Sequence, residues 1–193
     1  MSRERLACYI EGGTPPGGSR ANPGCRDRRP PRAVRPLWLP GGVYFALRSP
    51  MWGGGLAGYD PGLPGAAPAC AHLVTAGQFA DIAAQEMYRP PGTDLDLAPV
   101  LRTGRHLLGP GRYETMLHVG DLDGHPILTF TASWTQADVA PTAPSAGYLR
   151  AIGAGVRSAH GWSPARVGGY LAGRPGAAGH WTPERVTALL TAR

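Results

Sequence analysis

The pattern of apolar and polar positions changes from a strand-like run to a helical spacing within residues 69–86. Residues 69–74 are small and apolar, which predicts a strand that Pro68 limits upstream. Thr75 then predicts a helix N-cap, because its hydroxyl can accept a hydrogen bond from an amide of the first turn. The positions spaced i, i+3, i+4 and i+7 on one face of this helix are Phe79, Ile82, Ala83 and Glu86. A carboxylate is therefore expected on the apolar side of the helix, in its last turn.

Glu86 has two interpretations in that position. Exposed glutamates are common, so the last turn could release the side chain to solvent before Pro90 and Pro91 end the helix. Alternatively, the helix could hold Glu86 away from solvent as a general acid and base. Asp81 and Gln85 are expected to point away from the apolar face. The spacing alone leaves both interpretations open.

The chain before the central helix alternates between short elements and loops. Residues 2–10 predict a short helix. Residues 11–36 are rich in Gly, Pro and Arg and predict a long loop that is either functional or mobile. Residues 37–47 contain a strand, and residues 51–59 predict a second strand loosened by glycine. Strands are therefore expected on the N-terminal side of the helix.

Strands also follow the central helix. Residues 94–103 predict a short helix within a long excursion. Residues 113–119 and 126–134 predict two strands, joined by an Asp-Gly turn within residues 121–124. Because strands bracket the helix on both sides, the pattern predicts an α+β fold with a mixed sheet or small barrel, and not a βαβ repeat.

The C-terminal part of the chain is predicted to be helical. Residues 146–160 carry apolar residues at helical spacing, and Gly161 can end that helix in a left-handed conformation. Trp162-Ser-Pro and Trp181-Thr-Pro then predict two further helix starts, with the hydroxyl residue as N-cap and proline in the first turn. We expect two short packing helices, each preceded by an anchoring tryptophan.

The basic charge does not indicate nucleic-acid binding. The formal net charge is +6, yet all 19 basic residues are arginine. Arginine rises together with Ala, Gly and Pro, which is typical of a GC-rich coding bias. The arginines of residues 26–35 are interleaved with proline and lack the stacking aromatics of a nucleic-acid surface. We therefore expect a solvated loop there and no nucleic-acid partner.

Length and cysteine content favour one reduced domain. A chain of 193 residues predicts a single domain, 1–193, with a barrel part at 1–143 and C-terminal helices at 144–193. No apolar run reaches the roughly 18 residues of a membrane span, and no secretory signal is visible. The three cysteines form no C-x-x-C pair and are expected to be free thiols. These features predict a cytoplasmic protein without a membrane partner.

Two motifs match known sites only superficially. Gly53-x-Gly55-x-x-Gly58 has the dinucleotide spacing, but the chain breaks at Tyr59-Asp-Pro-Gly62 where that motif requires a helix. A glycine-rich strand that lets a ligand or another backbone approach is the better interpretation. The six histidines show no zinc spacing, and a hairpin turn explains Asp121-x-Asp-x-His125. We therefore expect no metal and no organic cofactor.

Pro144-Ser-x-x-Tyr148-Leu149 can be explained as a capped helix start whose tyrosine packs inward. In combination with the strand and helix of residues 72–86 and the hairpin of residues 113–134, however, it resembles the gamma-glutamylcyclotransferase-like family. The resemblance covers residues 1–161. It implies a small mixed β-barrel with flanking helices, here with a helical C-terminal extension.

The resemblance also implies the site. Glu86 takes the place of the catalytic general acid and base, although Met87 replaces the glycine that usually follows it. The family's glutamyl-binding loop is Tyr-Gly-Ser-Asn followed by Leu or Met, and Met1 would be the last residue of that motif. On this basis the first strand and most of the loop are expected to be missing. The residues expected to bind substrate are Met1, Ser2, Gly53, Gly54, Gly55, Tyr113 and Tyr148.

The implied reaction is the cyclisation of a γ-glutamyl group to 5-oxoproline with release of an amine or amino acid. The partner is then a small γ-glutamyl peptide or amine. Positioned backbone amides, such as those of residues 53–55, could stabilise the developing oxyanion. The sequence does not specify the leaving amine, and it leaves a homodimer open.

Two other classes of function remain open at this point. The first is a non-catalytic barrel that serves as a binding module, which the absent Tyr-Gly-Ser-Asn loop favours. The second, with less support, is a metal-dependent deacetylase or other hydrolase.

Overall fold

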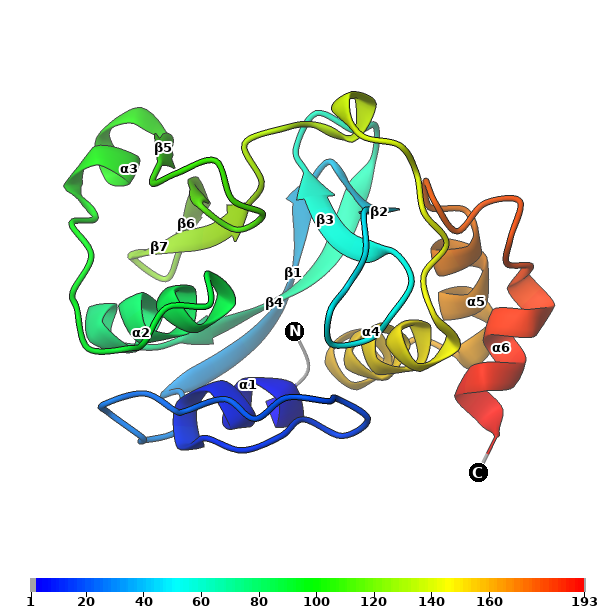
Figure 1. Ribbon diagram of the computed structural model, residues 1–193, viewed down its shortest axis with the longest axis horizontal. Helices are drawn as coiled ribbons and strands as arrows, with labels where there is room; N and C mark the ends of the chain where they lie inside the picture. The colour runs from blue at the N-terminus through cyan, green and yellow to red at the C-terminus, as the bar shows by residue number, and fades with distance from the viewer. Residues whose placement is uncertain (1–2, 193) are drawn as a thin grey trace.

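The computed structural model describes residues 3–192, and these form an α+β fold (Figure 1). The strands are β1 (Ala33–Pro40), β2 (Gly42–Ala46), β3 (Leu56–Asp60), β4 (Ala66–Leu73), β5 (Arg105–Leu107), β6 (Thr115–Leu122) and β7 (His125–Thr131). The helices are α1 (Arg3–Glu11), α2 (Ala76–Glu86), α3 (Ala98–Thr103), α4 (Ala146–His160), α5 (Pro164–Ala172) and α6 (Pro183–Thr191), with a short 3-10 turn, η1 (Gln136–Asp138). The predicted α+β class is confirmed.

The described strands pair as three small antiparallel sheets, where a mixed sheet was expected. β1 pairs with β4, β2 pairs with β3, and β5, β6 and β7 form a three-stranded sheet in that order. In Figure 1 the two-stranded sheets lie at the centre. α2 and the β5–β7 sheet lie on one side of them, and α4, α5 and α6 lie on the other.

β4 starts earlier than its composition predicts. The strand begins at Ala66 and runs through Pro68, which faces Trp38 of β1. Proline lacks an amide hydrogen and is tolerated on an edge strand. β4 is such a strand, because within residues 3–192 its only sheet neighbour is β1. The expectation that Pro68 limits the strand was therefore wrong.

Two other boundaries also differ from the prediction. β1 begins at Ala33, inside the segment expected to be loop, because residues 33–40 pair in continuous register with β4. Residues 51–55, expected to be strand, form a turn in which Gly53 and Gly54 have φ angles of 66° and 62°. A left-handed backbone cannot continue a strand, so β3 starts only at Leu56.

The helix starts follow their predicted caps. The Thr75 hydroxyl accepts from the Gln78 amide, and the Gln78 side chain accepts from the Thr75 amide, which completes a capping box. Ser145 caps α4, and Gly161 ends that helix in the left-handed conformation. Asp123 and Gly124 also have positive φ angles, as the predicted hairpin turn between β6 and β7 requires.

Two buried clusters form the core. The larger cluster joins α4, α5 and α6 to β2 and contains Phe45, Tyr148, Leu149, Val156, Trp162, Val167, Leu171, Ala172, Ala177, Val186 and Leu190. The smaller cluster joins α1 to α2 and contains Leu6, Tyr9, Ile10, Cys25 and Ile82. As expected, the Trp-led helices pack into the core, and the Trp181 indole nitrogen donates to the Pro144 carbonyl at 3.0 Å. No helix within residues 3–192 has the length and apolar character to cross a membrane.

Candidate active site

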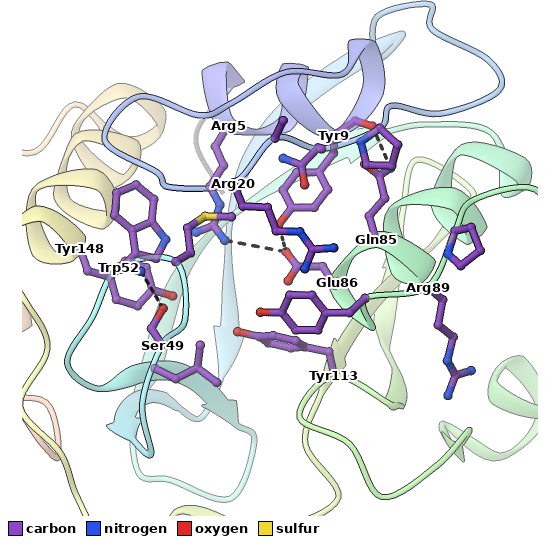
Figure 2. A pocket seen from close by; sticks show the side chains of 17 residues that line it. Arg5, Tyr9, Arg20, Ser49, Trp52, Gln85, Glu86, Arg89, Tyr113 and Tyr148 are labelled. Atoms are coloured by element: carbon purple, nitrogen blue, oxygen red, sulfur yellow. Dashed lines mark hydrogen bonds and ion pairs between the residues drawn. The ribbon is translucent and has the colours of Figure 1, made fainter.

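A pocket of about 310 Å³ lies where the two core clusters meet. Tyr9 of the smaller cluster and Tyr148 of the larger cluster both line it. The remaining walls come from the end of α2, the segment between β2 and β3, and the loop that follows α1 (Figure 2). The pocket therefore brings together segments that are far apart in the sequence.

Glu86 projects into this pocket from the last residue of α2 (Figure 2). Its side chain is only 10% exposed. The Tyr9 hydroxyl donates to Glu86 Oε1 at 2.5 Å, and the Arg5 guanidinium lies 3.9 Å from the same oxygen. Of the two interpretations of this residue, the structure supports a carboxylate held inside the protein. Among the described lining residues, Glu86 is the only carboxylate.

The groups around Glu86 stay protonated at neutral pH. Burial raises the pKa of Tyr9, and the neighbouring Glu86 carboxylate raises it further. Burial by itself would lower the pKa of Arg5, but its interactions with Tyr148, Glu86 and Tyr9 outweigh burial and raise that pKa. Tyr9 is therefore a neutral hydrogen-bond donor, and Arg5 is a permanent cation next to the carboxylate.

Tyr113 and Tyr148, both predicted to bind substrate, lie in the same pocket as Glu86 (Figure 2). The Tyr148 ring stacks on Trp52, with centroids 5.4 Å apart and planes within 5°. Burial is the main cause that raises the pKa of both phenols. Each hydroxyl therefore keeps its proton and can donate to an acceptor in the pocket.

Gln85 fixes the end of α2 against α1 and the loop that follows it. Its side-chain amide donates to the Tyr9 carbonyl at 3.0 Å and accepts from the Gly24 amide at 3.3 Å. Asp81, one turn earlier, is fully buried and accepts from the backbone and side chain of Arg26. Both residues do point away from the Glu86 face, but that second face is also buried. α2 is thus covered on two sides, and this holds Glu86 in place.

The glycines Gly53, Gly54 and Gly55 have a different role from the expected one. None of them is among the residues that line the pocket. The Gly53 amide donates to the Ser49 carbonyl at 3.0 Å, and the Gly55 amide donates to the Ala143 carbonyl at 2.7 Å. These two amides are therefore already used by the protein, which argues against the expected oxyanion role. Gly54 and Gly55 allow the close approach of another backbone segment, residues 142–145.

Replacing Gly55 with alanine is expected to destabilise the fold by about 2–3 kcal/mol, because the new methyl group overpacks a backbone contact. A Cβ atom at Gly55 would lie 2.1 Å from the Thr142 carbonyl oxygen. Urea unfolding followed by circular dichroism measures the change. Gly147→Ala is the control, since a Cβ atom there meets nothing within 4 Å and the backbone is not left-handed. A Gly55→Ala variant as stable as the parent would contradict the packing role.

Some predicted site residues cannot be placed, and several residues that line the pocket were missed. Met1 and Ser2, expected to bind substrate, lie outside the described residues. Tyr9 lies in the helix predicted over residues 2–10 and was assigned no role, although a buried tyrosine hydroxyl usually needs a partner and could have signalled a site. Arg5 and the loop residue Arg20 had no signal in the local sequence pattern.

Within residues 3–192, no three or more His, Cys, Asp or Glu side chains form a group that could hold a metal ion.

Comparisons with known proteins assign no family to this chain. No family model matches the sequence, and neither the curated proteins nor the solved structures contain a match.

Proposed function

We propose that this chain is a gamma-glutamylcyclotransferase-like enzyme, which cyclises a γ-glutamyl group to 5-oxoproline and releases an amine or amino acid. The observation that carries the proposal is Glu86, a shielded carboxylate at the end of α2 that projects into a small pocket. The pocket volume of about 310 Å³ is at the lower end of the range for small-molecule sites. A short γ-glutamyl compound is of suitable size.

The charges in the pocket complement a γ-glutamyl group. Such a group carries an α-ammonium and an α-carboxylate on one carbon. Glu86 provides the negative partner and Arg5 the positive partner, with 3.9 Å between Arg5 and the nearer Glu86 oxygen. In the proposed complex the ammonium lies against Glu86 and the substrate carboxylate against Arg5.

Glu86 then acts twice in the proposed reaction. It first accepts a proton from the α-ammonium, and the free amine attacks the γ-carbonyl carbon to form a new C–N bond. When the resulting tetrahedral intermediate collapses, the bond to the leaving nitrogen breaks, and Glu86 returns its proton to that nitrogen. The ring nitrogen gives its second proton to the departing amine, which leaves as an ammonium ion. Both reacting groups belong to one short chain, so correct folding of that chain provides much of the acceleration. No group from outside the substrate is consumed.

The negative charge on the γ-oxygen needs hydrogen-bond donors in this scheme. Tyr113 and Tyr148 are suitable, because burial raises the pKa of both phenols and keeps them protonated. Preorganised donors of this kind stabilise a developing oxyanion. In the proposal they replace the amides of residues 53–55.

The resemblance noted in the sequence supports the same proposal. The strand β4, the helix α2 with its terminal glutamate, the β6–β7 hairpin and the capped start of α4 follow each other in the family's order. The barrel is a part of the proposal: the three described sheets would belong to one small barrel around which the helices pack.

The test is the release of 5-oxoproline from a panel of γ-glutamyl amino acids and γ-glutamyl amines. The proposal expects 5-oxoproline and free amine in equal amounts, from at least one member of the panel. No release from any compound would overturn it. Calorimetric binding of the same compounds without turnover would favour the binding module instead.

Replacing Tyr9 with phenylalanine is expected to lower kcat by about 10- to 100-fold, because the Glu86 carboxylate loses a charged hydrogen bond that fixes its position. KM is expected to change by less than about threefold, since Tyr9 is assigned no contact with the leaving group. Steady-state kinetics of 5-oxoproline release separates the two parameters.

Tyr170→Phe is the matched control for Tyr9→Phe. The Tyr170 hydroxyl is buried without a hydrogen-bond partner in the described chain, and this residue is packed against the larger core cluster. The control is expected to leave kcat unchanged. Equal kcat values for Tyr9→Phe and the parent would contradict the role assigned to the Tyr9 hydroxyl.

A further inference from the structure

A second pocket, of about 760 Å³, lies between the β1–β4 ribbon, the β6–β7 hairpin and α2. Its longest stretches of lining are residues 69–76 and 125–130, and we name this pocket the slot. Most of the lining is apolar, and among the described lining residues Arg35 and Asp123 are the only arginine and the only acidic residue. The slot shares no lining residue with the pocket of Glu86.

The slot runs along the edges of β4 and β7, as its lining pattern shows. Successive side chains of a strand point to opposite faces, so a pocket on one face meets every second residue. β1 follows this rule, and its lining residues are Ala33, Arg35, Leu37 and Leu39. β4 and β7 do not follow it, because residues 69–73 and 125–130 line the slot without a gap. A pocket that meets both faces of a strand lies beside the strand, where the backbone is accessible.

Neither of these edges is paired with another strand in the described chain. β4 pairs only with β1, and β7 pairs only with β6. Residues 125–131 form no backbone–backbone hydrogen bond with a described segment other than β6. On β4, the Ala69 carbonyl accepts from His160 Nε2 at 2.9 Å, and the Leu73 carbonyl accepts from the Arg32 amide at 2.9 Å. Two open strand edges therefore face the same slot.

The composition of the two edges does not protect them. Proteins commonly block an open edge with charged residues or proline. Residues 69–74 and 127–130 read Ala-Cys-Ala-His-Leu-Val and Ile-Leu-Thr-Phe, without proline, arginine or an acidic residue. Their side chains are only half-buried. The slot thus offers backbone donors, backbone acceptors and apolar contacts to a single occupant.

We propose that the slot binds an extended, uncharged and apolar peptide segment of another polypeptide. The segment pairs with β4 on one side and with β7 on the other, so that the two sheets join in the order β1, β4, added strand, β7, β6, β5. In this mode of recognition, backbone hydrogen bonds provide affinity and alternate side chains provide specificity. Binding does not depend on the proposed reaction, because the two pockets have separate linings.

The geometry sets the length and chemistry of this segment. Six consecutive residues of β7 line the slot, which corresponds to about 20 Å of extended chain. A strand between two others is covered on both faces, so a continuous apolar run fits better than an alternating one. A lipid would cover the apolar lining but would leave the backbone groups of both edges without partners.

The test uses the fluorescein-labelled peptide Lys-Lys-Val-Ile-Val-Thr-Ile-Val-Lys-Lys, whose six central residues favour an extended strand. The control peptide has the same side chains, with N-methyl groups on its four innermost residues, so these cannot donate to either edge. Fluorescence anisotropy is expected to show saturable binding of the first peptide. The control peptide is expected to bind at least about tenfold more weakly, since two or more net hydrogen bonds are lost.

Replacing Ala71 with tryptophan is expected to weaken binding of the first peptide by at least about tenfold, because the large side chain occupies the slot. Ala66→Trp is the matched control. Ala66 lies on the same strand, but it is exposed and outside the lining. This control is expected to keep the affinity within about threefold, and far-UV circular dichroism verifies that both variants are folded.

Hydrogen exchange measured by mass spectrometry tests the pairing in the unchanged protein. The bound peptide is expected to slow amide exchange in residues 69–74 and 127–130 by about tenfold, and to leave residues 42–46 unaffected. Absence of saturable binding, or equal affinity of the two peptides, would overturn the proposal. Binding of palmitate in place of the peptide would assign the slot to a lipid, and edge protection that grows with protein concentration alone would assign it to a second copy of the chain. Either result would overturn the peptide as occupant.

Discussion

Replacing Glu86 with glutamine is expected to reduce 5-oxoproline release by about 10³-fold, within the range that general acid–base catalysis contributes. Glutamine has nearly the same size and keeps an oxygen that can accept from the Tyr9 hydroxyl. It cannot take a proton from the α-ammonium or return one to the leaving nitrogen. The loss is therefore expected in kcat, measured in a coupled assay of 5-oxoproline.

The Glu86→Gln variant is expected to remain folded, because the substitution preserves packing at the end of α2. Its free energy of unfolding should lie within about 1–2 kcal/mol of the parent, since one charged hydrogen bond becomes a neutral one. Glu11→Gln is the control, because Glu11 is exposed at the end of α1 and does not line the pocket. Parent-level release by a folded Glu86→Gln variant would contradict the assigned role.

Local signals in the sequence were sufficient to predict the element that presents the catalytic candidate. The Thr75 cap, the helical spacing and the two prolines after the helix place Glu86 at its end, and the structure agrees. The start of α4 at Ser145 was predicted in the same way. A cap and a helical period depend on residues within a few positions of each other, so a single sequence contains them.

The surroundings of Glu86 could not be predicted from the sequence. Tyr9 is 77 positions away from Glu86, and only the packing of α1 on α2 brings the two side chains together. Tyr148 reaches the pocket from the other core cluster. Contacts of this kind are set by tertiary structure and leave no periodic pattern in the chain.

The role of the glycine-rich segment, residues 53–55, was also only partly predictable from the sequence. Its sequence predicts that another group approaches the backbone closely, but it does not identify that group. In the structure Gly55 lies against Thr142 and Ala143, and not against a substrate site. The long loop was expected to be functional or mobile, and only the structure shows that Arg20 lies at the pocket.

Replacing Asp81 with asparagine is expected to lower the free energy of unfolding by about 1.5–3 kcal/mol at pH 7, because the donors around a buried carboxylate lose their charged acceptor. The Asp81 side chain is 1% exposed. It accepts from the Arg26 amide at 2.9 Å, the Arg26 Nε at 3.0 Å and the Gly92 amide at 3.0 Å. Asparagine would turn an NH₂ group toward donors and leave part of this set unsatisfied. Urea unfolding followed by circular dichroism measures the change.

Asp94→Asn is the matched control for Asp81→Asn. Asp94 binds the same arginine, with 2.5 Å between Arg26 Nη2 and Asp94 Oδ1, but its side chain is 78% exposed. Exposed ion pairs contribute about 0–1 kcal/mol, so the control should change stability by less than that. A loss in Asp94→Asn as large as that in Asp81→Asn would assign the effect to Arg26 alone.

The pH dependence of the Asp81 effect distinguishes a charged pair from simple packing. Burial by itself would raise the pKa of Asp81, but the hydrogen bonds from Arg26 and Gly92 outweigh it and lower this pKa below the ordinary 3.8. A carboxylate with a lowered pKa in the folded state stabilises the protein above its unfolded pKa, and this contribution is lost as the pH falls through the folded value. The gap between the parent and Asp81→Asn should therefore be constant from pH 7 to about pH 5 and narrow below that. Asp81 and Gln85 together hold the helix end that carries Glu86, so the same acid range should also loosen the pocket. A difference in unfolding free energy between the parent and Asp81→Asn that stays constant down to about pH 3 would exclude a role for the charge.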